Sequence, residues 1–296
     1  MDGVINVLKP PGMTSADVVA WLRRTLSFRK IGHTGTLDPE VAGVLPICLG
    51  QATRLAEYFT EQGKAYRAEM LFGITTDTQD IHGRVLSSEP QNLERERVLE
   101  MLPHFLGKIS QVPPMYSAVR KDGKHLYEYA RAGVAVEREA KNVEIYHIEL
   151  VDWQEGEFPR ALLDIECGKG TYIRTLCHDL GEKLGTGGTM SYLLRTRSGP
   201  FALDASWTLE EIETTVQKGG DAFLLPPAAG LGLSRVDLAA ARAKAFCRGL
   251  PSSCQLVKGS EPRDGQAVQV FGGDECFLGI GIWREGAVYP HKVMAE

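Results

Sequence analysis

Residues 32–39 have the sequence Gly-His-Thr-Gly-Thr-Leu-Asp-Pro, and the rest of the chain is best understood outward from this loop. Its two glycines allow the backbone to approach a ligand closely. Asp38 precedes a proline, which disfavours a helical conformation at the aspartate. No Gly-Lys-Ser/Thr ending follows, so this is not a Walker phosphate loop. A lone Asp-Pro in such a loop is more often an ordinary turn than a catalytic site.

The segments that flank this loop predict regular structure. Thr14–Asp17 forms a capping box, in which a hydroxyl is followed three residues later by a carboxylate. Apolar residues then follow at helical spacing through Leu26. Residues 45–50 predict a short buried strand, and the alternation over 66–72 predicts another.

Farther along the chain, predicted helices and strands are mixed without strict alternation. A helix capped by Asn92 is expected to run to about Leu106, and Pro103 should kink or shorten it. Residues 162–167 predict a strand, after which a glycine-rich turn leads into a helix near 175–184. This order predicts the α+β class.

A proline- and glycine-rich segment at 225–230 predicts a linker between a large and a small unit. We therefore expect domains at 1–230 and 231–296. In the second, Asp237 should cap a helix that ends near Arg248. The remaining pattern predicts a β-rich unit with short strands at 267–271, 276–283 and 287–289.

The composition is that of a soluble globular protein, with 43% hydrophobic and 24% charged residues in a chain of 296. The N-terminal residues lack the basic and apolar regions of a signal peptide, and no run of 18 apolar residues occurs. We therefore expect a cytoplasmic protein without a membrane span. The six cysteines form no Cys-x-x-Cys pair and the seven histidines no ligand pattern, which predicts no metal site.

The net charge of −5 argues against a surface coated with nucleic acid, but basic residues are concentrated locally. Four lie within 23–30, three within 120–124, and five against two acidic residues within 167–200. Acidic residues gather instead in 89–100 and 204–213. Such segregation allows one face to meet phosphate groups, although solvated helix faces alone would give the same pattern.

Two further segments place a lysine beside rigid or aromatic residues. Lys9 opens a Lys-Pro-Pro-Gly turn, which either presents the lysine to a ligand or is an ordinary surface turn. Lys64 and Arg67 flank Tyr66 at the start of a predicted strand. The tyrosine is either part of the core or a platform on which a base stacks, with basic neighbours for phosphate.

Residues 168–175 have the sequence Gly-Lys-Gly-Thr-Tyr-Ile-Arg-Thr. A Gly-Lys-Gly turn before a helix can bind an anion at the helix N-terminus or simply cap the helix. Tyr172 and Arg174 are two residues apart and would share a face in an extended segment. An arginine near a buried aspartate would keep that aspartate ionised.

Together and in this order, these motifs resemble those of the TruB family of tRNA pseudouridine-55 synthases. The resemblance covers nearly the whole chain, and the joint occurrence of its motifs is far more specific than any one of them. The motifs are Lys-Pro-x-Gly at 9–12, Gly-His-Thr-Gly-x-Leu-Asp-Pro at 32–39, Lys-x-Tyr at 64–66, Val-Pro-Pro-Met-Tyr-Ser-Ala at 112–118, Leu-Tyr-Glu-Tyr-Ala at 126–130 and Lys-Gly-Thr-Tyr-Ile-Arg-Thr-Leu at 169–176.

The resemblance implies that three residues carry the reaction. Asp38 corresponds to the essential aspartate and Arg174 to the arginine that pairs with it. Tyr66 corresponds to the tyrosine that stacks on the flipped uracil and takes part in the final proton removal. Three roles stay open for Asp38: attack on the sugar, attack on the base, or removal of a sugar proton.

Further residues are implied to bind the target nucleotide. His33 corresponds to the histidine that helps to displace the nucleotide from the T-loop. Tyr172 and Leu193 correspond to residues that pack around it in the pocket. Lys9 and Lys64, from the two lysine motifs, are expected to bind the substrate as well.

The resemblance also implies the fold and the reaction. The fold is a mixed, largely antiparallel sheet flanked by helices, with a thumb insertion at about 118–145 and a small PUA-like RNA-binding domain from residue 231. The reaction turns uridine 55 of the tRNA T-loop into pseudouridine after the nucleotide is flipped out. The reaction exchanges a C–N for a C–C glycosidic bond within one nucleotide, so no cofactor is required. The expected partner is tRNA, bound by a monomer without an obligate protein partner.

Other functions fit the sequence less well. A guide-RNA-dependent pseudouridine synthase would need partner proteins, and the lack of long terminal extensions disfavours it. An RNA-binding or tRNA-folding module with incidental catalysis would account for the basic segments and the small C-terminal domain. A metal hydrolase is disfavoured because the histidines form no ligand pattern.

Overall fold

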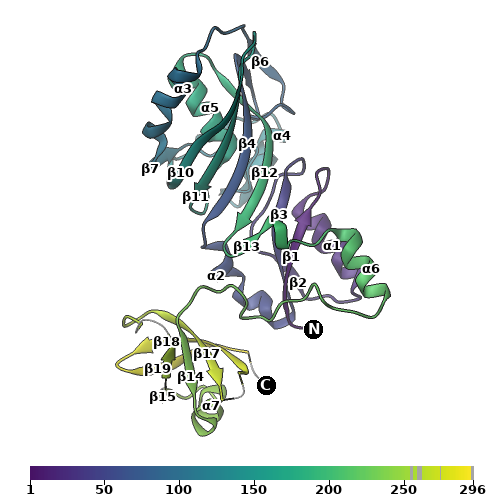
Figure 1. Ribbon diagram of the computed structural model, residues 1–296, viewed down its shortest axis with the longest axis vertical. Coiled ribbons are helices and arrows are strands. Elements are labelled where there is room, and N and C mark those ends of the chain that lie inside the picture. The colour runs from purple at the N-terminus through teal and green to yellow at the C-terminus, as the bar shows by residue number, and fades with distance from the viewer. Residues whose placement is uncertain (254–255, 259–261, 274, 295–296) are drawn as a thin grey trace.

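The computed structural model describes residues 1–253, 256–258, 262–273 and 275–294 and contains two large β-sheets (Figure 1). The larger sheet has nine strands. In spatial order its main path is β1 (Gly3–Lys9), β3 (Ala42–Leu49), β12 (Gly188–Ser198), β4 (Lys64–Phe72), β11 (Arg160–Cys167), β10 (Lys141–Gln154) and β7 (Gly107–Gln111), with β2 (Ile31–His33) beside β3 and β13 (Phe201–Ala202) beside β12.

The strand directions of this sheet confirm the mixed, largely antiparallel arrangement and the α+β class. Among the described strands of this sheet, β12 and β3 are the one parallel pair, in which Leu194 lies opposite Ala42 and Arg195 opposite Gly43. This pair joins the N-terminal strands to the rest of the sheet. On its other side β12 is antiparallel to β4, and Arg195 lies directly opposite Tyr66.

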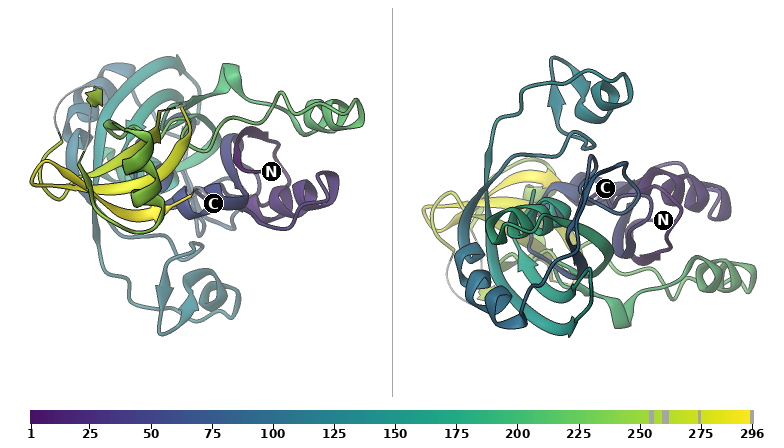
Figure 2. Two further views of the ribbon diagram at one scale, coloured as in Figure 1. Left: turned by 90° about the horizontal axis from the view of Figure 1, so that it is seen from below. Right: turned by 90° about the horizontal axis from the view of Figure 1, so that it is seen from above.

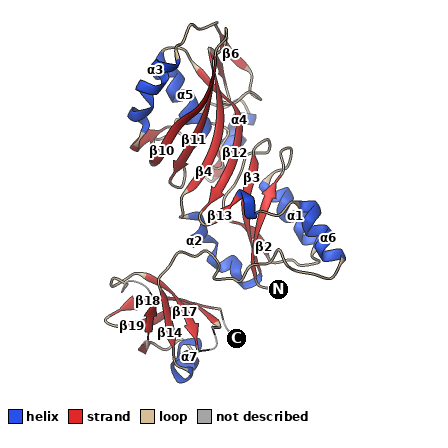
Figure 3. Ribbon diagram, in the orientation of Figure 1, coloured by secondary structure: helices blue, strands red, loops and turns tan. Residues whose placement is uncertain are grey.

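Helices flank the large sheet in two groups (Figure 3). Figure 1 shows α3 and α5 beside β10 and β11, and α1 and α6 beside β1. The helices are α1 (Ser15–Thr25), α2 (Ala56–Thr60), α3 (Arg95–Met101), α4 (Leu126–Arg131), α5 (Ile173–Leu184), α6 (Leu209–Gln217) and α7 (Ala240–Cys247), with short 3-10 turns at Gly50–Leu55, Leu102–Phe105 and Leu203–Ala205. In the described part of the chain, no helix is long and apolar enough to cross a membrane.

Two hydrophobic cores meet at the middle of the large sheet. One core packs β4, β10 and β11 against α3 and α5, and the other packs β1 and β3 against α1 and α6. Tyr66 and Leu193 are half-buried and contact both cores. The boundary between the cores therefore runs past these two side chains.

Local signals set the ends of two helices that position the site. Thr14 caps α1 in a reciprocal capping box with Asp17, as the sequence predicts. α5 ends at Leu184 because Gly185 adopts the left-handed conformation, with φ of 75°. The predicted helices at these two places are therefore confirmed.

The smaller sheet lies at the opposite end of the molecule from α3 (Figure 1). Ile280 is buried in one core with Val4 and Cys48, so the two sheets pack together. The predicted linker at 225–230 is also attached to the large sheet. Leu225 and Val4 form two backbone hydrogen bonds, of 2.8 and 2.9 Å. The strands of the smaller sheet, in spatial order, are β15 (Ser252–Ser253), β19 (Ala287–Val293), β18 (Phe277–Arg284), β17 (Ala267–Gly272), β14 (Arg235–Leu238) and β16 (Leu256–Lys258).

Two small hairpins extend from this framework. β5 (Ile74–Thr76) pairs with β6 (Val85–Ser88), and β8 (Arg120–Lys121) pairs with β9 (Lys124–His125). The segment with β8, β9 and α4 projects away from the large sheet (Figure 2). This projecting segment falls within the range 118–145 that was expected for a thumb insertion, but the last residues of that range belong to β10, which begins at Lys141.

The predicted start of the helix near Asn92 was wrong. Leu93 is buried in the core beside α3, and the helix begins only after Glu94, which is the N-cap. The α-helix then ends at Met101, and a 3-10 turn containing Pro103 follows, which agrees with the expected shortening.

The predicted capping role of Asp237 was also wrong. This residue lies inside β14, and its carboxylate accepts a hydrogen bond of 2.7 Å from Arg235. α7 begins after Ala239 instead. An ion pair within the strand therefore occupies the carboxylate that the sequence pattern assigned to a helix cap.

Candidate active site

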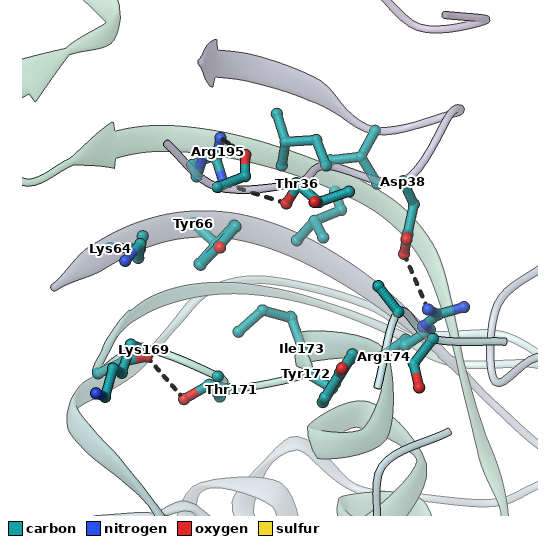
Figure 4. Close-up of a pocket in the computed structure, with 18 of the residues that line it drawn as sticks. Thr36, Asp38, Lys64, Tyr66, Lys169, Thr171, Tyr172, Ile173, Arg174 and Arg195 are labelled. Atoms are coloured by element: carbon teal, nitrogen blue, oxygen red, sulfur yellow. Dashed lines mark hydrogen bonds and ion pairs between the residues drawn. The ribbon is translucent and has the colours of Figure 1, made fainter. Parts of the chain in front are cut away.

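A cavity of about 290 Å³ opens at the boundary between the two cores (Figure 4). Its walls come from the loop after β2, from β4 and β12, and from the turn before α5. The sequence therefore brings together segments more than 100 residues apart. The predicted site residues that line the cavity are Asp38, Lys64, Tyr66, Tyr172, Arg174 and Leu193.

Asp38 and Arg174 both line this cavity, and their side chains form an ion pair (Figure 4). The Asp38 Oδ2 atom lies 3.2 Å from Arg174 Nη2, and Nη1 of the same guanidinium lies 3.5 Å from Asp80 Oδ2. Arg174 Nη2 also donates a hydrogen bond of 2.6 Å to Tyr116 O. The arginine side chain is only 6% exposed, whereas that of Asp38 is 43% exposed. The arrangement leaves the aspartate accessible and its cation fixed.

The environment raises the pKa of the Asp38 carboxyl above its ordinary value. Withdrawal from water is the main cause, the Arg174 guanidinium opposes it, and the neighbouring Asp80 carboxylate adds to it. Arg174 lowers the pKa of Asp38, in the direction that the sequence predicts, but burial outweighs it. Arg174 offsets part of the effect of burial, and the Asp38 carboxylate becomes protonated at a higher pH than that of an ordinary aspartate.

Asp80 is a site residue that the sequence did not reveal. It lies in the turn between β5 and β6, and its Oδ1 accepts hydrogen bonds from Thr78 Oγ1 at 2.8 Å and from His82 N at 3.0 Å. These bonds orient the second oxygen toward Arg174. A polar turn such as this one gave no signal of its own, because its role depends on which helix packs beside it.

Tyr66 lies on β4 with its ring in the cavity (Figure 4). Burial raises the pKa of its phenol, while the Arg195 charge on the neighbouring strand lowers it. Leu193 lines the cavity from β12. An aromatic ring and a leucine at the junction of two cores form an apolar surface suited to a planar base.

Tyr172 and Arg174 do not share an extended segment, so that expectation was wrong. Tyr172 is the N-cap of α5, and Arg174 lies in the first helical turn. Gln111 fixes the tyrosine backbone, since its Oε1 accepts from Tyr172 N at 3.1 Å and its Nε2 donates to Tyr172 O at 3.2 Å. Both side chains reach the cavity because the chain turns there, and not because of a two-residue repeat.

Lys9 does not present itself on a surface turn, which corrects the sequence-based expectation. The residue is fully buried and lies outside the cavity lining. Its Nζ donates to the carbonyl oxygens of Pro10 at 2.7 Å, Met13 at 2.5 Å and Pro39 at 2.9 Å. With all three ammonium protons engaged, Lys9 holds the residue after Asp38 in place.

Ser15 fixes the other side of the aspartate. This first residue of α1 accepts a hydrogen bond of 2.9 Å at Oγ from Leu37 N. The backbone is thus held immediately before and immediately after Asp38. A carboxylate on a loop anchored in this way keeps its direction without a bound ligand.

Lys64 lines the cavity but is buried, which disfavours the phosphate contact suggested by the sequence. Its Nζ donates to Thr60 O at 2.5 Å and Gln62 O at 2.6 Å. His33 lies on β2 outside the lining, and burial lowers the pKa of its imidazole. Within the described residues its buried Nδ1 has no hydrogen-bond partner.

The donor set does not suggest a metal centre. Among the residues that the structure describes, no group of three or more histidine, cysteine, aspartate or glutamate side chains is placed to hold an ion. The cavity offers one carboxylate, its arginine, the two aromatic rings of Tyr66 and Tyr172, and buried cations.

Comparisons with known families define the class. The N-terminal domain profile of the TruB family pseudouridylate synthases matches residues 23–173. The tRNA pseudouridylate synthase B C-terminal domain matches residues 174–226, and a TruB pseudouridine synthase C-terminal profile matches residues 234–294. The chain is thus similar to pseudouridylate synthases over nearly its whole length.

Individual relatives narrow the assignment. The tRNA pseudouridine synthase B of Moorella thermoacetica is 46% identical over 99% of both chains. That of Symbiobacterium thermophilum is 57% identical over 78% of this chain and 76% of its own length. The protein belongs to the TruB family.

Solved structures show the same fold. A chain in a Cbf5-Nop10-Gar1 complex has a TM-score of 0.77 at 29% identity, covering 98% of this chain and 84% of that one. A chain in an H/ACA RNP bound to a substrate RNA containing 2'-deoxyuridine also has a TM-score of 0.77, at 26% identity, with coverages of 99% and 85%.

Proposed function

We propose that this protein converts uridine 55 in the T-loop of tRNA into pseudouridine. The observation that carries the proposal is the Asp38–Arg174 pair, 3.2 Å apart, in a cavity that Tyr66 also lines. Relatives that are 40–57% identical are tRNA pseudouridine synthases B, which supports tRNA as the substrate.

The reaction needs an isolated nucleotide, because the reacting base is hidden in the folded T-loop. Flipping it out costs a few kcal/mol. Tyr66 would recover about 1–3 kcal/mol of this by stacking on the uracil. The cavity of about 290 Å³ is at the small end of ligand pockets, which favours a single base over a larger group.

Asp38 is the reacting group in this proposal, and its exposed side chain lets the sugar and base approach. Arg174 holds the carboxylate and offsets part of its raised pKa. Tyr66 keeps the detached uracil in the cavity and takes part in the last proton transfer. Tyr172 and Leu193 enclose the base, whereas Lys9 and Lys64 support the cavity from within the fold.

Two parts outside the cavity are proposed to hold the RNA. The projecting thumb carries Arg120, Lys121 and Lys124 and would close over the T-arm. We propose residues 1–230 as the catalytic domain and 231–296 as a PUA-like RNA-binding domain, in a cytoplasmic monomer that needs no protein partner and no cofactor.

The structural likeness to chains of H/ACA RNPs makes a guide-RNA-dependent enzyme the second candidate. One experiment separates the two. Purified protein is incubated with an unmodified tRNA transcript and no other macromolecule, and pseudouridine is mapped at single-nucleotide resolution. The matched control transcript has cytidine at position 55.

We expect stoichiometric pseudouridine at position 55 and none elsewhere in the T-arm. Conversion only after a guide RNA and partner proteins are added would favour the second candidate. Tight binding without conversion would favour an RNA-binding or tRNA-folding module.

A further inference from the structure

Arg195 is a buried cation at the back of the cavity that the roles above do not use. The residue is 1% exposed and lines the cavity from β12. Each of its three nitrogens donates to a backbone carbonyl: Nε to Val44 at 2.6 Å, Nη2 to Gly35 at 3.2 Å and Nη1 to Thr36 at 3.5 Å. It thereby ties the loop of Asp38 to the large sheet.

Carbonyl oxygens satisfy the hydrogen bonds of Arg195 but do not neutralise its charge. No carboxylate of the described residues lies within 4.0 Å of its guanidinium, whereas Arg174 has two. A buried charge without a counter-charge is costly, so a neutral side chain would hold the loop at lower cost. The retained charge calls for a negative partner that is absent from the folded chain.

A second buried cation adds to this surplus. Lys64 lines the same cavity and also binds only carbonyl oxygens. Its pKa is lowered to about 8 by burial and by the charge of Arg195 nearby. Lys64 is the first residue of β4 and Arg195 lies on the adjacent β12, so both positive charges lie near Tyr66 (Figure 4).

An RNA phosphate does not fit as the missing partner. Arg195 is almost fully buried, and its nitrogens already face three carbonyl oxygens. A phosphate could reach it only by breaking those bonds. A negative charge on a base inside the cavity needs no direct contact, because electrostatic interactions act over several ångströms in a water-excluded site.

The proposed reaction creates such a charge. When the C1′–N1 bond breaks, both of its electrons leave with N1, and the uracil becomes an anion whose charge is shared with O2 and O4. Asp38 neutralises the positive charge left on the sugar by bonding to C1′ or by accepting a sugar proton. If Asp38 instead attacks the base, the uracil ring becomes an enolate and carries the same charge. Later C5 bonds to C1′, and Asp38 leaves the carbon that it attacked or returns the sugar proton that it accepted. The C5 proton is lost and N1 gains a proton, so the sum is an isomerisation.

We propose that Arg195 is a positioning residue whose uncompensated charge stabilises the anionic uracil formed during the reaction. This proposal rests on the proposed function, because it requires a uracil that leaves and rebonds. The loop contacts of Arg195 fix where the charge stands. The buried positive charges of Arg195 and Lys64 are in place before the reaction begins. Such preorganised charges stabilise an anion as it develops.

The test compares two leaving groups with the same enzyme variants. Transcripts carry uridine or 5-fluorouridine at position 55, and fluorine withdraws electrons and stabilises the uracil anion by itself. The measured quantity is the single-turnover rate at which the N-glycosidic nucleoside disappears, determined by nuclease digestion and mass spectrometry. The variants are Arg195→Gln, Arg195→Lys and a control, Arg197→Gln, which removes the same charge from the same strand outside the cavity.

We expect Arg195→Gln to slow cleavage of uridine about 100-fold and cleavage of 5-fluorouridine less than about 10-fold. Arg195→Lys keeps the charge and should stay within about 10-fold of the wild type on both substrates. Arg197→Gln should change neither rate by more than about twofold.

Equal slowing of both substrates by Arg195→Gln would overturn the proposal and leave only a structural clamp. If that variant does not fold, judged by circular dichroism, Lys64→Gln replaces it, with the same substrate pattern expected and the same contrary outcome. Failure of the wild-type protein to convert uridine 55 would instead refute the proposed function.

Discussion

Arg174 and Arg195 stand at opposite sides of one cavity and are buried to nearly the same extent. Arg174 binds two carboxylates, Asp38 and Asp80, whereas Arg195 binds three backbone carbonyl oxygens. Arg174 therefore fixes the Asp38 side chain, and its charge is balanced by carboxylates. Arg195 fixes a loop, and carbonyl oxygens leave its charge unbalanced. Burial and residue type alone do not tell these roles apart; the partners do.

Tyr66→Phe should have the largest effect among the substitutions around the two arginines that leave Asp38 in place. The ring lies opposite Arg195 in the sheet and inside the cavity beside Asp38. Phenylalanine keeps the stacking surface but loses the hydroxyl, so we expect kcat to fall about 1,000-fold with little change in affinity for tRNA. Tyr172→Phe is the matched control and should lose less than tenfold. A kcat of Tyr66→Phe equal to that of the wild type would remove the proton-transfer role.

Arg174→Lys should cost more than Arg195→Lys, which tests the comparison directly. A lysine cannot span two carboxylates as the guanidinium fork does, so one of Asp38 and Asp80 would lose its partner. We expect kcat/KM to fall about 100-fold for Arg174→Lys and about tenfold or less for Arg195→Lys. Equal decreases in the single-turnover rates of the two variants would show that the two arginines have the same role.

Asp80→Asn should shift the pH dependence of the reaction. The pKa of Asp38 is raised by burial and by the Asp80 charge, so the active carboxylate is lost as the pH falls through this raised value. Removing the Asp80 charge should move the acidic limb of kcat/KM to lower pH. Since Arg174 loses one anchor, we also expect the plateau to fall about tenfold.

Asp77→Asn is the control for this shift. That residue lies in the same turn, and its carboxylate accepts a hydrogen bond from Arg84 N. Asp77 forms no ion pair with Arg174, so the acidic limb of kcat/KM for Asp77→Asn should coincide with that of the wild type. A shift of the limb to higher pH in Asp80→Asn would contradict the assignment of its charge.

Ser15→Ala should have the smallest effect. It removes the 2.9 Å hydrogen bond to Leu37 N while Lys9 and Arg195 continue to hold the loop. We expect the free energy of unfolding to fall by about 1 kcal/mol and kcat to fall a few-fold. Denaturant unfolding and steady-state rates measure the two quantities. A loss of kcat as large as that of Arg174→Lys would show that the loop depends on α1 more than on its buried cations.

Local signals predicted much of the fold. The Thr14 capping box, the helix over 175–184 and the strands now seen as β3, β4 and β11 depend on neighbouring residues, and each was expected. The 14-residue β10 was missed because two register shifts, near Ile145 and Leu150, break its alternation of apolar and polar residues. A pattern of period two cannot detect a strand that changes its phase.

The site residues divide in the same way. Asp38, Tyr66 and Arg174 were expected from motifs, and the structure brings them to one cavity. The burial of Lys9 and the part played by Asp80 could not be predicted. Each depends on a contact between distant segments: β1 with the loop end at Pro39, and the β5–β6 turn with α5.

The role of Asp38 as the reacting group is the central claim, and the substitution Asp38→Asn tests it most directly. Asparagine keeps the size and loses only the negative charge, while Glu40→Gln removes an exposed charge two residues away as a control. Bound and converted tRNA are measured in the same samples at saturating enzyme. We predict tRNA affinity near that of the wild type and a conversion rate lower by at least about 10,000-fold. Conversion by Asp38→Asn within about tenfold of the wild type would contradict the account.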